Sequence, residues 1–155
     1  MENANHSENG LRSFSLYNIA FTVTNLEASL KWYKDIFGFK QISRSNFQLP
    51  QGTAEAAIIE AGGLKLELLY VPNGKRIEEM FAQLPFHLIP IGNKAIVLQV
   101  KDISVASEEL AALGVKFVYR EQNLVEGAMR SSMIEDIDGN KINIFQTDTL
   151  IENIK

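Results

Sequence analysis

The stretch that decides the fold is IAFTVTNLEAS at residues 19–29, because residues 96–106, IVLQVKDISVA, repeat its pattern 77 positions later (96 minus 19). Farther along, GFK at 38–40 matches GVK at 114–116, and GLKLEL at 63–68 matches GNKINI at 139–144, both at an offset of 76 (114 minus 38). Identity is low, but the segments recur in the same order at nearly constant spacing. The chain is therefore predicted to contain two copies of one structural unit.

Within each copy the hydrophobic period changes from 2 to 3.6 and back, which predicts a strand, a helix and then more strands. In the first copy a strand over 16–24 runs to Asn25, a good N-cap, and the helix after it ends at Gly38. In the second copy Asp102 and Gly114 hold the equivalent positions. The remaining strands are expected at 39–44, 54–61 and 64–71, and at 115–120, 129–135 and 141–146. These elements predict an α+β fold of two β-α-β-β-β modules, whose curved mixed sheets enclose a pocket.

The predicted organisation has five parts. A disordered tail covers residues 1–14, the first module 15–71 and the second module 95–147. Residues 72–94 link the modules and carry one short amphipathic helix at 76–83. Residues 148–155 form a C-terminal tail.

Composition excludes several classes of function. The 155 residues include 15 Lys and Arg against 19 Asp and Glu, a formal charge of -4, which argues against nucleic acid as a partner. Cysteine is absent, which excludes disulfides, thiolate nucleophiles and zinc sites that use sulfur. The only histidines, His6 and His87, are too few for a histidine-rich metal site. No apolar stretch of about 20 residues and no signal peptide is visible, so we expect a cytoplasmic protein without a membrane partner.

Side chains alternate between the two faces of a strand, so each strand can be divided by parity. One parity is uniformly apolar and is predicted to lie under the helices: Ile19, Phe21, Val23, Leu64, Leu66, Leu68, Ile96, Leu98, Val100, Ile142 and Ile144. The other parity mixes small, polar and apolar side chains: Asn18, Ala20, Thr22, Lys65, Glu67, Leu69, Ala95, Val97, Gln99, Lys141, Asn143 and Phe145. This mixed face either meets solvent or lines a ligand pocket.

Two segments carry a resemblance to a known family, NIAFTVTNLEASLKWY at 18–33 and EDIDGNKI at 135–142. Together with the paired modules they resemble the vicinal oxygen chelate family, which includes glyoxalase, extradiol dioxygenase and bleomycin-resistance proteins. The resemblance covers about residues 15–146. It implies the paired-module fold and, together with the open sheet edges of each module, a homodimer.

The resemblance also implies where a metal would bind, because metal enzymes of this family place ligands at four equivalent points. In this sequence those points are Asn18, Glu67, Ala95 and Asn143. Only Glu67 is a strong ligand, whereas a hard divalent cation needs several oxygen or imidazole ligands with compensating charge. We therefore predict no cofactor and no tightly bound metal, with weak divalent binding at most.

The predicted ligand-binding residues lie on the mixed face: Asn18, Thr22, Lys65, Glu67, Leu69, Gln99, Asn143 and Phe145. Glu67 is the candidate catalytic residue, either as a general base or as an anchor for a ligand donor, and the alternative is a surface carboxylate. His87 is either an imidazole base or a packed residue of the linker.

Three functions remain open on this basis. The first is a small-molecule-binding protein, or a metal-independent enzyme, of the glyoxalase/bleomycin-resistance fold. The second is a metal-dependent lyase, isomerase or dioxygenase with an unusual ligand set, and the third is a non-catalytic dimerisation or regulatory module. The sequence leaves open whether any reaction is catalysed.

Overall fold

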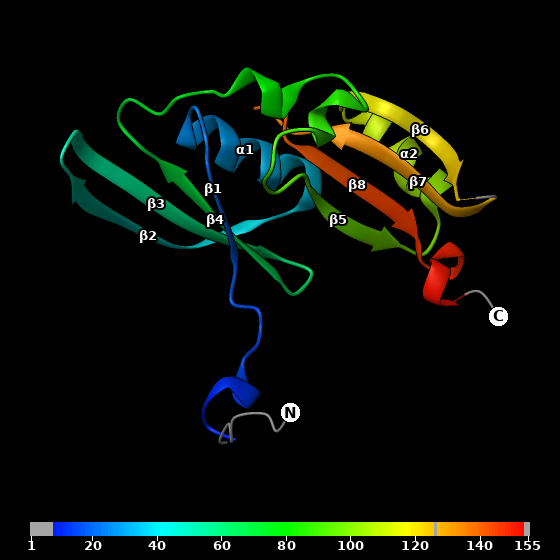
Figure 1. Ribbon diagram of the computed structural model, residues 1–155, viewed down its shortest axis with the longest axis horizontal. Helices are drawn as coiled ribbons and strands as arrows, with labels where there is room; N and C mark the ends of the chain where they lie inside the picture. The colour runs from blue at the N-terminus through cyan, green and yellow to red at the C-terminus, as the bar shows by residue number, and fades with distance from the viewer. Residues whose placement is uncertain (1–7, 126, 154–155) are drawn as a thin grey trace.

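The computed structural model describes residues 8–125 and 127–153, and within these ranges it contains two α-helices and eight strands (Figure 1). The strands form two four-stranded sheets, with orders β1-β4-β3-β2 and β5-β8-β7-β6. The first sheet comprises β1 (Ile19–Thr22), β2 (Lys40–Leu49), β3 (Gly52–Ala61) and β4 (Leu64–Tyr70). The second comprises β5 (Ala95–Val100), β6 (Phe117–Leu124), β7 (Ala128–Glu135) and β8 (Lys141–Gln146).

The two helices, α1 (Leu26–Phe37) and α2 (Ile103–Ala112), have the predicted caps. The Asn25 side chain accepts a hydrogen bond from the Ala28 N–H, and Asp102 accepts from the N–H groups of Ser104 and Val105. Gly38 has φ 74°, the left-handed conformation that ends a helix at low steric cost when the residue has no Cβ.

Both sheets are mixed, which confirms the predicted fold class. In each module the first strand pairs in parallel with the last, and the other pairs are antiparallel. The two sheets remain separate, so the strands do not close into a barrel.

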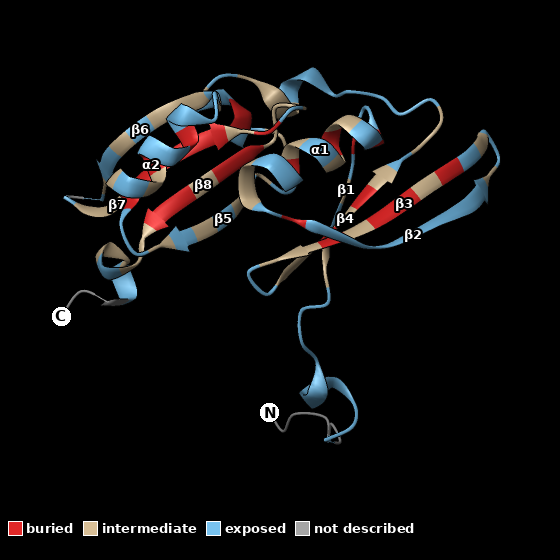
Figure 2. Cartoon of the chain, turned by 180° about the vertical axis from the view of Figure 1, so that it is seen from behind, coloured by how far each residue is buried: buried red, intermediate tan, exposed pale blue. Residues whose placement is uncertain are grey.

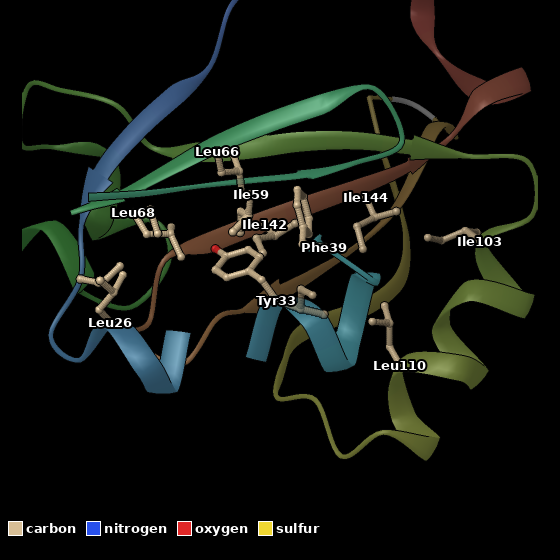
Figure 3. Close-up of a cluster of buried hydrophobic side chains, with 13 residues drawn as sticks. Leu26, Tyr33, Phe39, Ile59, Leu66, Leu68, Ile103, Leu110, Ile142 and Ile144 are labelled. Atoms are coloured by element: carbon tan, nitrogen blue, oxygen red, sulfur yellow. The ribbon is translucent and has the colours of Figure 1, made fainter. Parts of the chain in front are cut away.

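Every residue of the predicted apolar parity belongs to the hydrophobic core or packs against it. Leu66 and Ile144, on the central strands β4 and β8, are almost fully buried. Figure 3 shows these side chains on the side of the strands that faces the two helices. The parity assignment from the sequence is therefore correct.

A buried hydrogen bond joins the two modules. The Tyr33 hydroxyl, on α1, donates to Oδ2 of Asp136 in the β7–β8 turn at 2.7 Å. The same carboxylate accepts from the N–H groups of Asp138 and Asn140 and from the Asn140 amide. Burial, together with the Asp136 charge, raises the pKa of Tyr33 well above its usual range. The hydroxyl therefore stays protonated and remains a donor.

Four predicted elements differ in the structure. β2 extends to Leu49 and β6 to Leu124, beyond the ends expected at residues 44 and 120, and two other elements are shorter than expected. The strand expected over 16–24 is reduced to β1. The register Ile19↔Leu66 would set Tyr17 and Asn18 opposite Leu64 and Lys65, but the pairing begins only at Ile19. The helix expected over 76–83 is present only as a 3-10 turn at Glu78–Phe81, and a second such turn follows at Phe86–Leu88. Ile77 provides no capping side chain, and Pro85 has no N–H to continue a helix.

The terminal segments contain only short 3-10 turns where they are described, at Leu11–Ser13, Thr147–Thr149 and Ile151–Asn153. Residues 1–7 of the expected disordered tail and residues 154–155 of the C-terminal tail lie outside the described residues. No helix in the described ranges combines the length and hydropathy needed to cross a membrane.

Candidate functional site

The predicted site residues lie on the faces of the sheets that point away from the helices, which we call the open faces. Both helices lie behind the sheets in Figure 1 and in front of them in Figure 2, so the two open faces look toward the same side of the molecule. Ala20, Thr22, Ala95, Val97 and Gln99 are exposed there. The chain alone therefore leaves much of this surface open to solvent.

On the first sheet the strand register brings the candidate residues together. Glu67 is paired with Ala20, and Leu69 is paired with Thr22. Asn18 directly precedes β1, and the Lys65 ammonium lies 5.3 Å from the centre of the Tyr17 ring, a cation–π contact. Asn18, Lys65, Glu67 and Leu69 are half-buried, whereas Thr22 is exposed.

The Glu67 carboxylate has no hydrogen-bond or ion-pair partner within the described part of the chain. Three other partly buried carboxylates are paired, Glu55 with Arg44, Glu121 with Arg130 and Glu135 with Lys141, whereas Glu60 on β3 is unpaired like Glu67 within the described residues. An ionised carboxylate can accept several hydrogen bonds. Glu67 therefore offers free acceptors to a ligand on the open face.

On the second sheet the site contains two residues that the sequence reasoning missed. The Tyr119 hydroxyl donates to Oδ1 of Asn143 at 3.1 Å and shares a 2.9 Å hydrogen bond with Oγ of Ser131. The register sets Tyr119 opposite Met133 and Met133 opposite Asn143, so these residues form a row across three strands. Extending the parity argument to β7 would have placed Ser131 on this face. Parity alone would have placed Tyr119 with Phe117 on the core side, because the register shift between these two residues brings Tyr119 to the open face.

The other two candidates on the second sheet differ in exposure. Phe145 is only 7% exposed and is paired with Gln99 on one side and Ser131 on the other. Gln99 is exposed at the sheet edge. A ligand on this face would therefore have much more access to Gln99 than to Phe145.

His87 lies apart from these residues, in the linker. Its side chain is 5% exposed, and its Nδ1 has no hydrogen-bond partner within the described residues. Burial lowers the pKa of His87, and the charges of Lys141 and Lys94 lower it further. The imidazole is thus a packed, neutral group rather than an exposed base.

The four positions at which the resemblance implies metal ligands do not fit a divalent cation. Ala95 has no donor atom, and Oδ1 of Asn143 already accepts from Tyr119. The described residues contain no group of three or more His, Cys, Asp or Glu side chains that could hold a metal ion. We therefore derive no chemical step through a metal.

Comparison with known proteins agrees with the architecture. The family model of the Glyoxalase/Bleomycin resistance protein/Dioxygenase superfamily matches residues 15–144, which span both modules. The chain belongs to this superfamily. The resemblance identified in the sequence is thereby confirmed, and the superfamily includes glyoxalases, fosfomycin resistance proteins and dioxygenases.

Solved structures of the superfamily share the fold at low identity. The fosfomycin resistance protein FosX from Listeria monocytogenes is 19% identical with a TM-score of 0.63, and the match covers 90% of this chain and 96% of that one. A glyoxalase family protein from Bacillus cereus is 19% identical with a TM-score of 0.66, covering 91% and 97%. A glyoxalase I variant from Zea mays is 18% identical with a TM-score of 0.62, covering 83% of this chain.

The chain spans only 43% of the length of the maize glyoxalase I chain. Comparison with curated protein sequences gives no match. At these identities the similarity within the superfamily shows the fold alone, and function has to be argued from the site.

Proposed function

We propose that this chain is a metal-independent small-molecule-binding protein of its superfamily, with the ligand held on the open faces. The observation that supports this most strongly is the Tyr119–Asn143 hydrogen bond. It occupies an oxygen at a family metal position, while another such position, Ala95, carries no donor. Glu67 alone then offers a carboxylate, which suits a ligand hydroxyl or amine better than a divalent cation.

Each predicted residue has a role in this proposal. Glu67 accepts a charge-assisted hydrogen bond from the ligand, and it becomes a general base if the bound ligand excludes water and raises its pKa. Polar side chains orient the ligand around it, and apolar ones contact its carbon atoms. The polar set is Asn18, Thr22, Lys65, Gln99 and Asn143, and the apolar set is Leu69 and Phe145.

A second copy of the chain completes the site in this proposal. Large apolar side chains are exposed on the N-terminal segment and on β2, with Phe14 at 85% and Ile42 at 51%. All of β2 except its last residue is exposed, and Figure 2 shows this edge uncovered. Monomeric proteins rarely leave so much apolar surface open, so a homodimer is the expected assembly. The cytoplasm stays the compartment that the sequence predicts.

Native mass spectrometry of the purified protein tests for a bound small molecule and identifies it by mass. The affinity of that molecule is then measured for the parent and for Glu67→Gln, which is nearly isosteric. Losing a charge-assisted hydrogen bond costs about 1.5–3 kcal/mol, so affinity should fall roughly 10- to 150-fold.

Glu79→Gln is the matched control, because Glu79 is an exposed carboxylate in the 3-10 turn of the linker and lies on neither sheet. It should bind like the parent. If Glu67→Gln also binds like the parent, Glu67 is not part of the site. If the protein carries no small molecule and takes none up, the third function, a regulatory or dimerisation module, is favoured instead.

A further inference from the structure

A small cavity lies where the two modules meet. β1 and β5 are edge strands, each paired on one side only, and both line the cavity. Its volume is about 280 Å³, and the start of β8 lines it as well. Lys94 and Lys141 line it, whereas Glu67 and Asn143 do not. Ala20 and Ala95, which also line it, belong to the open faces, so the cavity adjoins the proposed open-face site without including Glu67 or Asn143.

The two lysines at this cavity retain free hydrogen-bond donors. The Lys141 ammonium, almost fully buried, donates to Oε1 of Glu135 at 3.1 Å and to the Gly139 carbonyl at 3.3 Å. The Lys94 ammonium donates to the Pro90 carbonyl. An ammonium has three donors, so within the described residues Lys141 keeps one and Lys94 keeps two.

The charge at this cavity is positive. Glu135 is the carboxylate that faces Lys141, but Oε2 of Glu135 also lies 3.3 Å from the Lys116 ammonium. One negative charge is thus shared between two lysines, and Lys94 has no acidic partner within the described residues. An anion would therefore gain a net favourable electrostatic interaction in a partly desolvated site.

The backbone of β1 adds another donor. The Val23 N–H donates to the Leu69 carbonyl at 2.8 Å, so the alternation of a parallel pair turns the Ala20 N–H away from β4 and toward the open edge. Ala20 lines the cavity.

The rest of the lining is mixed: Ile19, Phe21 and Ile96 are apolar, and Asn93 and Asn140 carry amide side chains. A bound molecule would therefore contact both hydrogen-bonding groups and hydrocarbon. The volume is at the lower end of the range for small-molecule sites, which limits the molecule to about a dozen heavy atoms.

We propose that this cavity binds a small aliphatic carboxylate, whose oxygens accept from Lys94, Lys141 and the Ala20 N–H. His87 reports on its occupancy, because the charges of the same two lysines act on the imidazole. A bound anion offsets those charges, so the pKa of His87 rises when the cavity fills.

Butyrate is the probe, followed by NMR of the histidine imidazoles during a pH titration. The chain has only two histidines, so the His87 signal is assigned with His87→Gln, and His6 serves as the internal reference. Sodium chloride at equal ionic strength controls for screening. Butyrate should raise the pKa of His87 in a saturable manner and leave His6 unchanged, while chloride should have no saturable effect.

Lys94→Gln should weaken butyrate binding about tenfold or more. Lys101→Gln, at an exposed lysine that does not line the cavity, is the matched control and should bind like the parent. Lys94 is preferred to Lys141 because removing Lys141 breaks a buried ion pair and endangers folding. Glu67→Gln removes a negative charge from the position paired with Ala20, so it should not weaken butyrate binding, whereas it should weaken binding of the proposed open-face ligand.

Three outcomes would overturn the proposal. The first is a His87 response to chloride equal to that with butyrate, and the second is Lys94→Gln binding as tightly as the parent. The third is inorganic phosphate binding as tightly as butyrate, because phosphate has no hydrocarbon to meet the apolar part of the lining.

Discussion

The hydrogen bond between Tyr33 and Asp136 is a buried contact between the two modules, and removing it should measurably lower the stability of the protein. Tyr33→Phe removes the hydroxyl and keeps the ring, which makes tilted or edge contacts with Phe21, Trp32 and Phe39. Core packing is thus preserved, and the change isolates one interaction. Both partners are buried, with Tyr33 1% and Asp136 6% exposed.

The expected loss in the free energy of unfolding follows from the negative charge on the acceptor, Asp136. A hydrogen bond to a charged group contributes about 1.5–3 kcal/mol to the free energy of unfolding. Asp136 keeps its bonds to the Asp138 and Asn140 N–H groups, so it is not left unpaired, and the lower half of this range is expected. A loss of about 2 kcal/mol lowers the melting temperature of a chain of this size by about 4–8 °C.

The assay is urea unfolding followed by the fluorescence of Trp32, the single tryptophan, which lies directly against Tyr33. The matched control is Tyr17→Phe, because Tyr17 is 64% exposed and its ring contact with Lys65 survives the change. The control should unfold like the parent. If Tyr33→Phe is as stable as Tyr17→Phe, the hydrogen bond contributes nothing measurable and the reasoning is refuted.

Three other predictions concern the core, the linker and the assembly. Leu66→Ala should lower the free energy of unfolding by about 2–5 kcal/mol, and Leu69→Ala, on the open face of the same strand, should lower it by clearly less. Equal losses for the two variants in urea unfolding would refute the parity assignment. Because the pKa of His87 is held below 6.5, the unfolded chain binds more protons, and stability should fall as pH drops from about 7.5 to 5.5. His87→Gln should lose less over the same interval, and an identical loss would exclude His87 as the cause. Light scattering should give twice the 17.4 kDa of one chain at micromolar concentration, and a monomer would contradict the homodimer.

Much of the fold could be predicted because the strongest signals were local and occurred twice. Asn25 and Asp102 cap the helices as expected, and the parity of the strands assigned the core side of both sheets. The short β1 could not be predicted, because its length depends on which residues pair with β4, a strand far away in the sequence.

The site was harder to predict, because its interactions join residues far apart in the sequence. Tyr119 reaches Asn143 across an intervening strand, and the bulges in β6 that shift its register have no clear pattern in the sequence. Whether Glu67 has a hydrogen-bond or ion-pair partner likewise depends on which side chains the folded sheet brings next to it. His87 was expected to be either an imidazole base or a packed residue of the linker. The conformation of the linker buries it, so it is a packed residue.

The measurement that tests the central claim most directly is the metal content of the protein, purified without chelator and incubated with nickel, zinc, manganese or iron(II). Plasma mass spectrometry after desalting should find far less than one metal per chain, because Glu67 is the only strong ligand at the four family positions and Asn143 is held by Tyr119. About one equivalent of metal that is lost in Glu67→Ala and kept in Glu79→Ala would contradict a metal-independent site.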